Sequence, residues 1–159
     1  VLIEKGILKG YMLDRLNARR MGLEPTGSSR RENYRFAPVS RMTNTYIAPG
    51  TDRVQDMLDS VEKGLFVMDI NAGSVDPVTG EFNFNTGETY LIEKGRITVP
   101  LTSATLIGTG SEILPKVDMV SDHFALEQGY CYAGSGQLPI GVGQPAVRIT
   151  EMTVGGKEL

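Results

Sequence analysis

The segment Leu2-Ile3-Glu4-Lys5-Gly6 recurs letter for letter as Leu91-Ile92-Glu93-Lys94-Gly95. An apolar stretch follows each copy, at residues 7–13 and at residues 97–101. Because glycine supplies the positive φ that tight hairpins need, each copy predicts a strand, a Lys-Gly turn and a returning strand. The repetition fits either an ancestral duplication or one turn solution used twice.

Two segments have the pattern of short helices. Residues 14–21 contain good helix formers, and Gly22 stands where a helix C-terminal glycine is common. Apolar residues recur every three or four positions over residues 54–61, which predicts a helix with one apolar side. Thr51 or Asp52 is expected to cap that helix at its N-terminus.

The rest of the chain is expected to consist mostly of strands and turns. Residues 102–114 mix helix formers with two glycines and predict a third, broken helix. Phe82 and Phe84 are expected to face inward from one strand because the run around them alternates cleanly. That strand is expected at residues 81–85, and others at residues 40–47, 65–70, 117–120 and 124–126 and in the last thirty residues. The sequence thus predicts an α+β fold that is mainly β, with antiparallel hairpins, a mixed sheet and two or three short helices.

Residues 24–39 and the strand after them form a candidate contact surface. A loop of this length is uncommon unless it is functional or disordered. The following strand carries polar residues on both faces, which suggests an edge position, and an edge strand can accept an extended peptide through backbone hydrogen bonds. Arg41, Thr43 and Asn44 are therefore candidate substrate-binding residues. The alternative is that Thr43 and Asn44 satisfy neighbouring backbone groups.

Cys131 is the only cysteine, and it lies in the glycine-rich segment 129–145. Glycines let the backbone turn sharply and approach a ligand closely. A free cysteine can serve as a small buried apolar side chain or as a reactive or ligating group. The chemistry of the residue leaves both interpretations open.

Composition excludes some classes of function. Lys and Arg total 16 against 19 Asp and Glu, a net charge of -3, which makes nucleic acid a poor partner. No apolar run reaches the roughly 18 residues of a membrane helix, and a single cysteine without an internal disulfide fits a reducing cytoplasm.

His123 is the only histidine, and it has no partner at ligand spacing. The chain starts at Val1, so we expect one folded piece of a longer protein.

Four blocks of sequence resemble the TldD/PmbA family. They are Asp-Arg-Leu-Asn-Ala-Arg at 14–19, Pro-Thr-Gly-Ser-Ser-Arg-Arg-Glu-Asn-Tyr at 25–34, Arg-Met-Thr-Asn-Thr-Tyr-Ile at 41–47, and Cys131 with Leu-Pro-Ile-Gly-Val-Gly-Gln-Pro-Ala-Val-Arg-Ile at 138–149 and Thr-Val-Gly-Gly at 153–156. The blocks occur in the family's order and span nearly the whole chain.

The resemblance implies that residues 1–159 are the C-terminal domain of a zinc metallopeptidase that cleaves unfolded or extended peptides. In the TldD branch, two histidines of a helical His-Glu-x-x-x-His motif bind zinc together with one cysteine of this domain, and the glutamate is the general base. Cys131 matches that cysteine. The motif is absent from this chain, so we expect no catalytic residue here, zinc in the full-length protein, and none in the isolated fragment. Many members carry Cys-Gly-Lys where this chain has Cys131-Tyr132-Ala133, which leaves the substrate preference open.

The resemblance also implies partners. A TldE/PmbA-like subunit, in a hetero-oligomer, or a second copy in a homodimer is expected beside the peptide substrate. Family members were once named modulators of DNA gyrase, but the charge balance gives no support for direct contact with nucleic acid, and no membrane is expected. One alternative is a noncatalytic peptide-binding or scaffold subunit of the PmbA (TldE) type. Another is an interaction module that exposes apolar surface.

Overall fold

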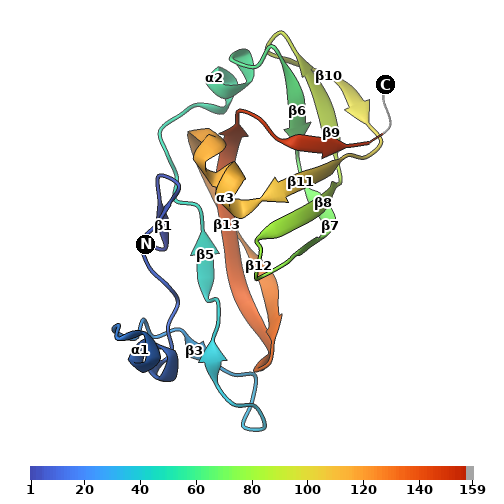
Figure 1. Ribbon diagram of the computed structural model, residues 1–159. Coiled ribbons are helices and arrows are strands. Elements are labelled where there is room, and N and C mark those ends of the chain that lie inside the picture. Colours follow the sequence, from blue (N-terminus) through green and yellow to red (C-terminus); the bar gives the residue numbers. More distant parts are fainter. Residues whose placement is uncertain (157–159) are drawn as a thin grey trace. The chain divides into compact units, whose positions relative to one another are not determined.

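The computed structural model describes residues 1–156, which form mainly strands with three short helices (Figure 1). This confirms the expected α+β, mainly β class. The chain divides into two compact units. Residues 1–49 and 124–145 form the first unit, and residues 50–123 with those from Ala146 onward form the second. None of the described helices combines the length and apolar character needed to span a bilayer.

The first unit begins with the expected hairpin. Strands β1 (Ile3–Glu4) and β2 (Ile7–Leu8) pair antiparallel. Lys5 and Gly6 between them have φ values of 51° and 76°, so both central residues of the turn are left-handed, as in a type I′ turn. Helix α1 (Arg15–Met21) follows and ends at Gly22, whose φ is 66°, which confirms the predicted cap.

A mixed sheet and a short hairpin-like pair complete the first unit. Strands β3 (Ser29–Arg30) and β4 (Val39–Ser40) pair antiparallel within the long loop. Strand β5 (Asn44–Tyr46) pairs parallel with β13 (Gly136–Ile149) and lies at the edge of their three-stranded sheet. The expected edge position is confirmed. The prediction of a single strand over 40–47 was wrong, because β4 and β5 are separate strands.

Strand β12 (Val117–Ala133) corrects a second expectation. It is one strand of 17 residues, where the sequence predicted two short strands. The turn Gly134-Ser135 joins it to β13, its hydrogen-bonded neighbour. Both strands contribute residues to both units.

The second unit contains two antiparallel sheets. The first has the order β10-β9-β6, with β6 (Lys63–Val67), β9 (Thr89–Glu93) and β10 (Arg96–Leu101). The second has the order β14-β11-β8-β7, with β7 (Ile70–Val75), β8 (Glu81–Thr86), β11 (Thr105–Thr109) and β14 (Thr153–Gly155). The hairpin of β9 and β10 has Lys94 and Gly95 at φ values of 50° and 75°, so it repeats the turn of the first hairpin. The helical elements of this unit are α2 (Val54–Asp59), α3 (Gly110–Ile113) and the 3-10 turn η1 (Leu114–Lys116).

Three local expectations fail in this unit. The helix expected over 102–114 forms only at Gly110–Ile113, because residues 105–109 are strand β11, which pairs with β8 and β14 on its two sides. Neither Thr51 nor Asp52 caps α2, because the N-cap residue is Arg53, which makes no side-chain cap hydrogen bond. The Asp52 carboxylate instead accepts a hydrogen bond from the Val120 amide at 2.8 Å. The buried strand expected over 65–70 is divided between β6 and β7 and is only partly buried. Phe82 and Phe84 do share the more buried face of β8, with ring centroids 5.2 Å apart.

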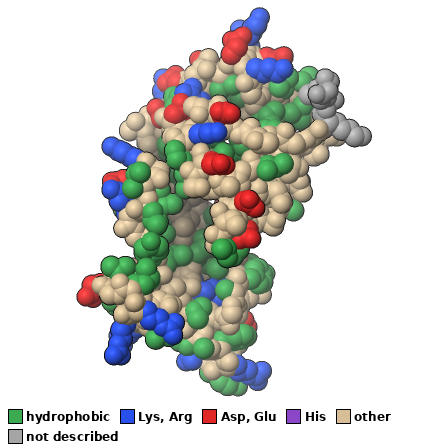
Figure 2. Space-filling view, in the orientation of Figure 1, with side chains coloured by type: hydrophobic (Ala, Val, Ile, Leu, Met, Phe, Trp, Pro, Cys, Tyr) green, Lys and Arg blue, Asp and Glu red, His purple; other side chains and the backbone are tan. Residues whose placement is uncertain are grey.

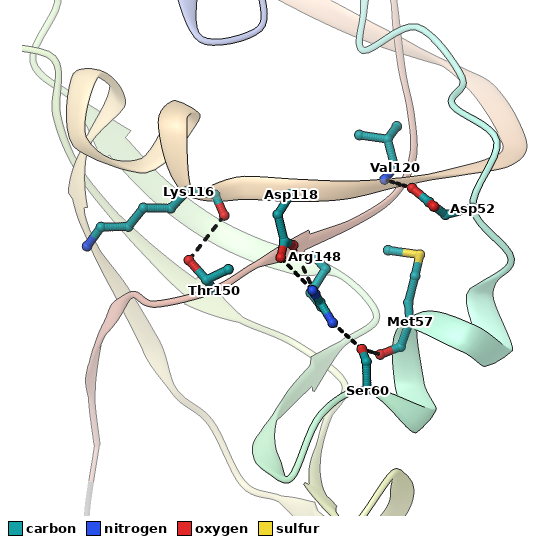
Figure 3. A network of polar contacts seen from close by, with 8 residues as sticks. All are labelled: Asp52, Met57, Ser60, Lys116, Asp118, Val120, Arg148 and Thr150. Atoms are coloured by element: carbon teal, nitrogen blue, oxygen red, sulfur yellow. Dashed lines mark hydrogen bonds and ion pairs between the residues drawn. The ribbon is translucent and has the colours of Figure 1, made fainter.

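A polar network joins α2 to the long strands within the second unit (Figure 3). Arg148 of β13 donates to both carboxylate oxygens of Asp118 on β12, at 2.9 and 2.5 Å, and to the hydroxyl of Ser60 at the end of α2. This pairing lowers the pKa of Asp118, first through the hydrogen bonds from Arg148. The Asp118 carboxylate and the Arg148 guanidinium therefore keep opposite charges over the ordinary pH range.

Candidate functional site

Cys131 lies near the end of β12, next to the turn that leads into β13. It is a free, half-buried thiol. Its neighbours Tyr130 and Tyr132 are 53% and 71% exposed, because successive side chains of a strand point to opposite faces. The thiol is therefore on the more covered face of the strand.

A buried arginine holds the backbone around this thiol. The Arg41 side chain is 2% exposed and comes from the segment between β4 and β5. Its Nη2 donates to the carbonyl oxygen of Cys131, and its Nη1 donates to Ser135 Oγ at 2.6 Å and to the Gly136 carbonyl at 2.8 Å. One guanidinium thus ties together β12, the turn and β13.

Glu32 holds the same turn from the long loop. Its amide donates to the Ser135 carbonyl at 2.9 Å, and its Oε2 accepts from the Gln137 amide at 2.8 Å. Gly136 has φ of 92°, and an added Cβ there would lie 2.3 Å from Glu32 Oε2. The close approach of the loop therefore requires glycine at this position.

Asp14 anchors the segment that carries Arg41. Its carboxylate accepts from the Asn17 amide at 2.8 Å, which caps α1, and from the amide and hydroxyl of Ser40 at 3.1 and 2.8 Å. These hydrogen bonds, led by the one from the Asn17 backbone, lower the pKa of Asp14 from 3.8 to about 2. The charged carboxylate thus fixes the residue immediately before Arg41.

An open cleft of about 470 Å³ lies beside β5 in the first unit. Arg30 forms part of its wall and donates to the carbonyls of Met42 and, at 2.9 Å, of Pro139. The cleft is lined by Arg30, Thr43, Asn44, Leu126, Glu127, Gln128, Pro139, Ile140 and Gly141. The structure therefore brings Thr43 and Asn44 together in one cleft. Arg41 lies outside that lining, and its role as a substrate-binding residue stays a prediction.

The donor set does not form a complete zinc site. Within residues 1–156, no three His, Cys, Asp or Glu side chains are grouped as metal ligands. His123 and Cys131 are not members of any such group among the described residues. Zinc needs at least three protein ligands in such sites. The described residues supply one sulfur donor, and its role as a ligand stays a prediction.

Sequence reasoning missed the contacts that hold Cys131 in place. Arg41 was chosen as a substrate residue, whereas its donors bind a hairpin about 90 residues further along the chain. Glu32 was not chosen at all. The unusual length of the loop at 24–39 was the one available signal, because it indicated a segment with a dedicated role.

Comparisons with known proteins identify the family. The model of the PmbA/TldA metallopeptidase C-terminal domain matches residues 1–156. The "Metalloprotease TldD homolog" of Haemophilus influenzae is 50% identical over 98% of this chain and 33% of its own length. The "Zinc metalloprotease TldD homolog" of Saccharolobus solfataricus is 30% identical over 98% of this chain and 35% of its own length. The chain thus spans about a third of the length of the curated relatives it matches.

Solved structures show the same fold. The crystal structure of TldE from Thermococcus kodakarensis superposes with a TM-score of 0.79 at 22% identity, over 98% of this chain and 33% of that one. A putative modulator of a DNA gyrase from Thermotoga maritima gives a TM-score of 0.77 at 21% identity, over 97% of this chain and 32% of that one. The match of the family model over residues 1–156 shows that the chain belongs to the PmbA/TldA metallopeptidase C-terminal domain family.

Proposed function

We propose that this chain is the C-terminal domain of a TldD-like zinc metallopeptidase that cleaves unfolded or extended peptides, with Cys131 as one zinc ligand. The observation that carries the proposal is the free, half-buried thiol of Cys131, whose strand is fixed by a buried arginine. The names of relatives as metalloproteases support the reaction class. The single cysteine supports a cytoplasmic location.

Zinc in proteins is bound by nitrogen and sulfur ligands, and a catalytic zinc keeps one position for water. A thiolate from this chain would add negative charge to the metal and strengthen its binding. The remaining ligands and the general base would come from residues outside 1–156, because the described residues form no ligand group of their own. This chain would deliver the thiol and a wall of the peptide site.

The edge strand β5 supports binding of an extended peptide. The Gly141 amide donates to the Thr43 carbonyl, and the Ile47 amide donates to the Gly143 carbonyl. Because alternate residues of a strand direct their backbone groups to the same neighbour, those of Asn44 and Tyr46 point away from β13. A peptide that pairs with this edge would gain backbone hydrogen bonds with little dependence on its sequence. Thr43 and Asn44 would contact it from the adjoining cleft.

The test is Cys131→Ala in the full-length protein. We expect zinc content to fall from one ion per chain to near zero and proteolysis of an unfolded substrate to be lost with it. Tyr132→Phe is the matched control on the same strand, because Tyr132 is exposed and its ring is retained. Full zinc content and activity in Cys131→Ala would refute the proposal.

The second candidate is a noncatalytic peptide-binding or scaffold subunit of the PmbA (TldE) type. The fold shared with a protein named TldE favours it, as does the edge strand β5, because backbone pairing with a peptide needs no metal. The sequence of the full-length protein decides between the two, because only the peptidase requires His-Glu-x-x-x-His. Either candidate would pair with a TldE/PmbA-like subunit or with a second copy, which size-exclusion chromatography with multi-angle scattering would distinguish.

A further inference from the structure

The hairpin around Cys131 is held by a buried cation without a carboxylate partner. Arg41 is 2% exposed, and none of the ion pairs among residues 1–156 includes it. Its Nε is buried and has no hydrogen-bond partner within these residues. Burying a guanidinium in this state is unfavourable, so simple packing would not favour arginine at this position.

The acceptors of Arg41 explain what the charge is used for. Three groups receive its hydrogen bonds, and all of them lie between Cys131 and Gly136. Hydrogen bonds from a charged donor are shorter and stronger than those between neutral groups. A guanidinium offers donors in a planar fork, and a lysine ammonium at the same place would not reach both strands of the hairpin with the same geometry.

We propose that Arg41 is a positioning residue for Cys131. It would act through the carbonyl of residue 131, to which its Nη2 donates, without itself binding the metal. Fixing that carbonyl sets the direction in which the thiol leaves the strand, so less freedom is lost when the thiol binds an ion. This inference rests on the proposed zinc role of Cys131, and it gives Arg41 a role that needs no substrate contact.

The closing experiment compares Arg41→Met, Arg41→Lys and Arg31→Met in the full-length protein. Methionine keeps much of the apolar length of arginine and removes every donor. Arg31 is an exposed arginine of the loop that precedes the segment with Arg41, and it serves as the matched control. Two quantities are measured: the zinc dissociation constant by competition with a chelator, and amide hydrogen exchange of residues 131–137 in the metal-free protein.

We expect Arg41→Met to weaken zinc binding about 10-fold to 100-fold, the range found for residues that orient metal ligands. Exchange at residues 131–137 should become faster, with the other peptides unchanged. Arg41→Lys should fall between Arg41→Met and the wild type, and it remains informative if Arg41→Met does not fold. Arg31→Met should match the wild type in both measurements.

Two outcomes would overturn the inference. If both Arg41 variants keep wild-type zinc affinity while Cys131→Ala loses zinc, Arg41 does not position the ligand and the proposed function stands. If exchange at residues 131–137 is unchanged in both variants, the hydrogen bonds from Arg41 do not hold the hairpin around Cys131. Failure of the proposed function has a different signature, because Cys131→Ala then retains zinc whatever the Arg41 variants do.

Discussion

Asp14 links the start of α1 to Ser40, the residue before the buried Arg41. Its pKa is lowered from 3.8 to about 2, so the folded state favours the charged carboxylate. The stability that it contributes is complete above its unfolded pKa and is lost as the pH falls through the folded value. We therefore expect Asp14→Asn to lower the melting temperature at pH 7, and the difference from the wild type to shrink between pH 4 and pH 2.

Thermal unfolding followed by circular dichroism at several pH values measures this effect. Asp122→Asn is the control, because Asp122 is exposed and lies outside this network. A difference between Asp14→Asn and the wild type that stays constant from pH 7 to pH 2 would contradict the linkage.

At the level of residues, sequence identified the important chemical groups but not their partners. Cys131 and Arg41 were each selected for a role, yet the hydrogen bond from Arg41 to the Cys131 carbonyl depends on the pairing of distant segments. Similarly, Asp52 has the right side chain for a helix cap, but its carboxylate accepts a hydrogen bond from the Val120 amide instead. Local propensity does not reveal such competition between partners.

Among the elements, the repeated Lys-Gly turns offer a direct test of backbone strain. Gly95 has φ of 75°, and an added Cβ would lie 2.9 Å from the Cα of Asp59. We expect Gly95→Ala to lower the free energy of unfolding by about 1–2 kcal/mol, the cost of a left-handed conformation for a residue with a Cβ. Gly134→Ala is the control, since nothing lies within 4 Å of its added Cβ, and its effect should stay within about 0.5 kcal/mol.

A substitution at Lys94 of the same turn is expected to change the stability in the opposite direction, towards a higher value. Its φ is 50°, a conformation that asparagine tolerates better than lysine. Lys94→Asn should therefore raise the midpoint of urea unfolding, whereas Gly95→Ala lowers it. Equal midpoints for the two variants would show that these φ values do not limit stability.

The elements also show where sequence patterns succeed. Both Lys-Gly hairpins and the Gly22 end of α1 depend on residues close together in the chain, and the structure has them where the sequence predicts them. Local pattern did not predict strand β11, because residues 105–109 are extended only through pairing with the distant strands β8 and β14. Gly108 looked like a helix breaker, but in β11 an added Cβ would lie 3.1 Å from the Phe82 ring. Its small size serves sheet packing instead.

For the whole chain, few large apolar side chains of the described residues are fully buried. Leu13, Met57, Ile92, Ile113 and Leu138 are buried, whereas hydrophobic side chains also appear on the surface (Figure 2). Ile7 and Leu8 of the first hairpin are 61% and 55% exposed. Contiguous exposed apolar surface promotes association.

We expect the isolated chain to give a light-scattering mass above 17.3 kDa that rises with concentration. The double variant Ile7→Lys, Leu8→Lys should reduce that association, because it replaces exposed apolar side chains by charges. Val78→Lys serves as the control at an isolated turn position that is 91% exposed. A constant monomeric mass for the unmodified chain would exclude this behaviour.

The division into two units has a practical consequence for anyone who wishes to recombine them. The chain passes from one unit to the other three times, after Pro49, His123 and Pro145. Neither unit can be excised as a continuous stretch, and residues 50–123 alone would leave β11 without its neighbour β14. A chimera must splice β12 and β13 at matched positions, because an error of one residue would turn every later side chain to the opposite face.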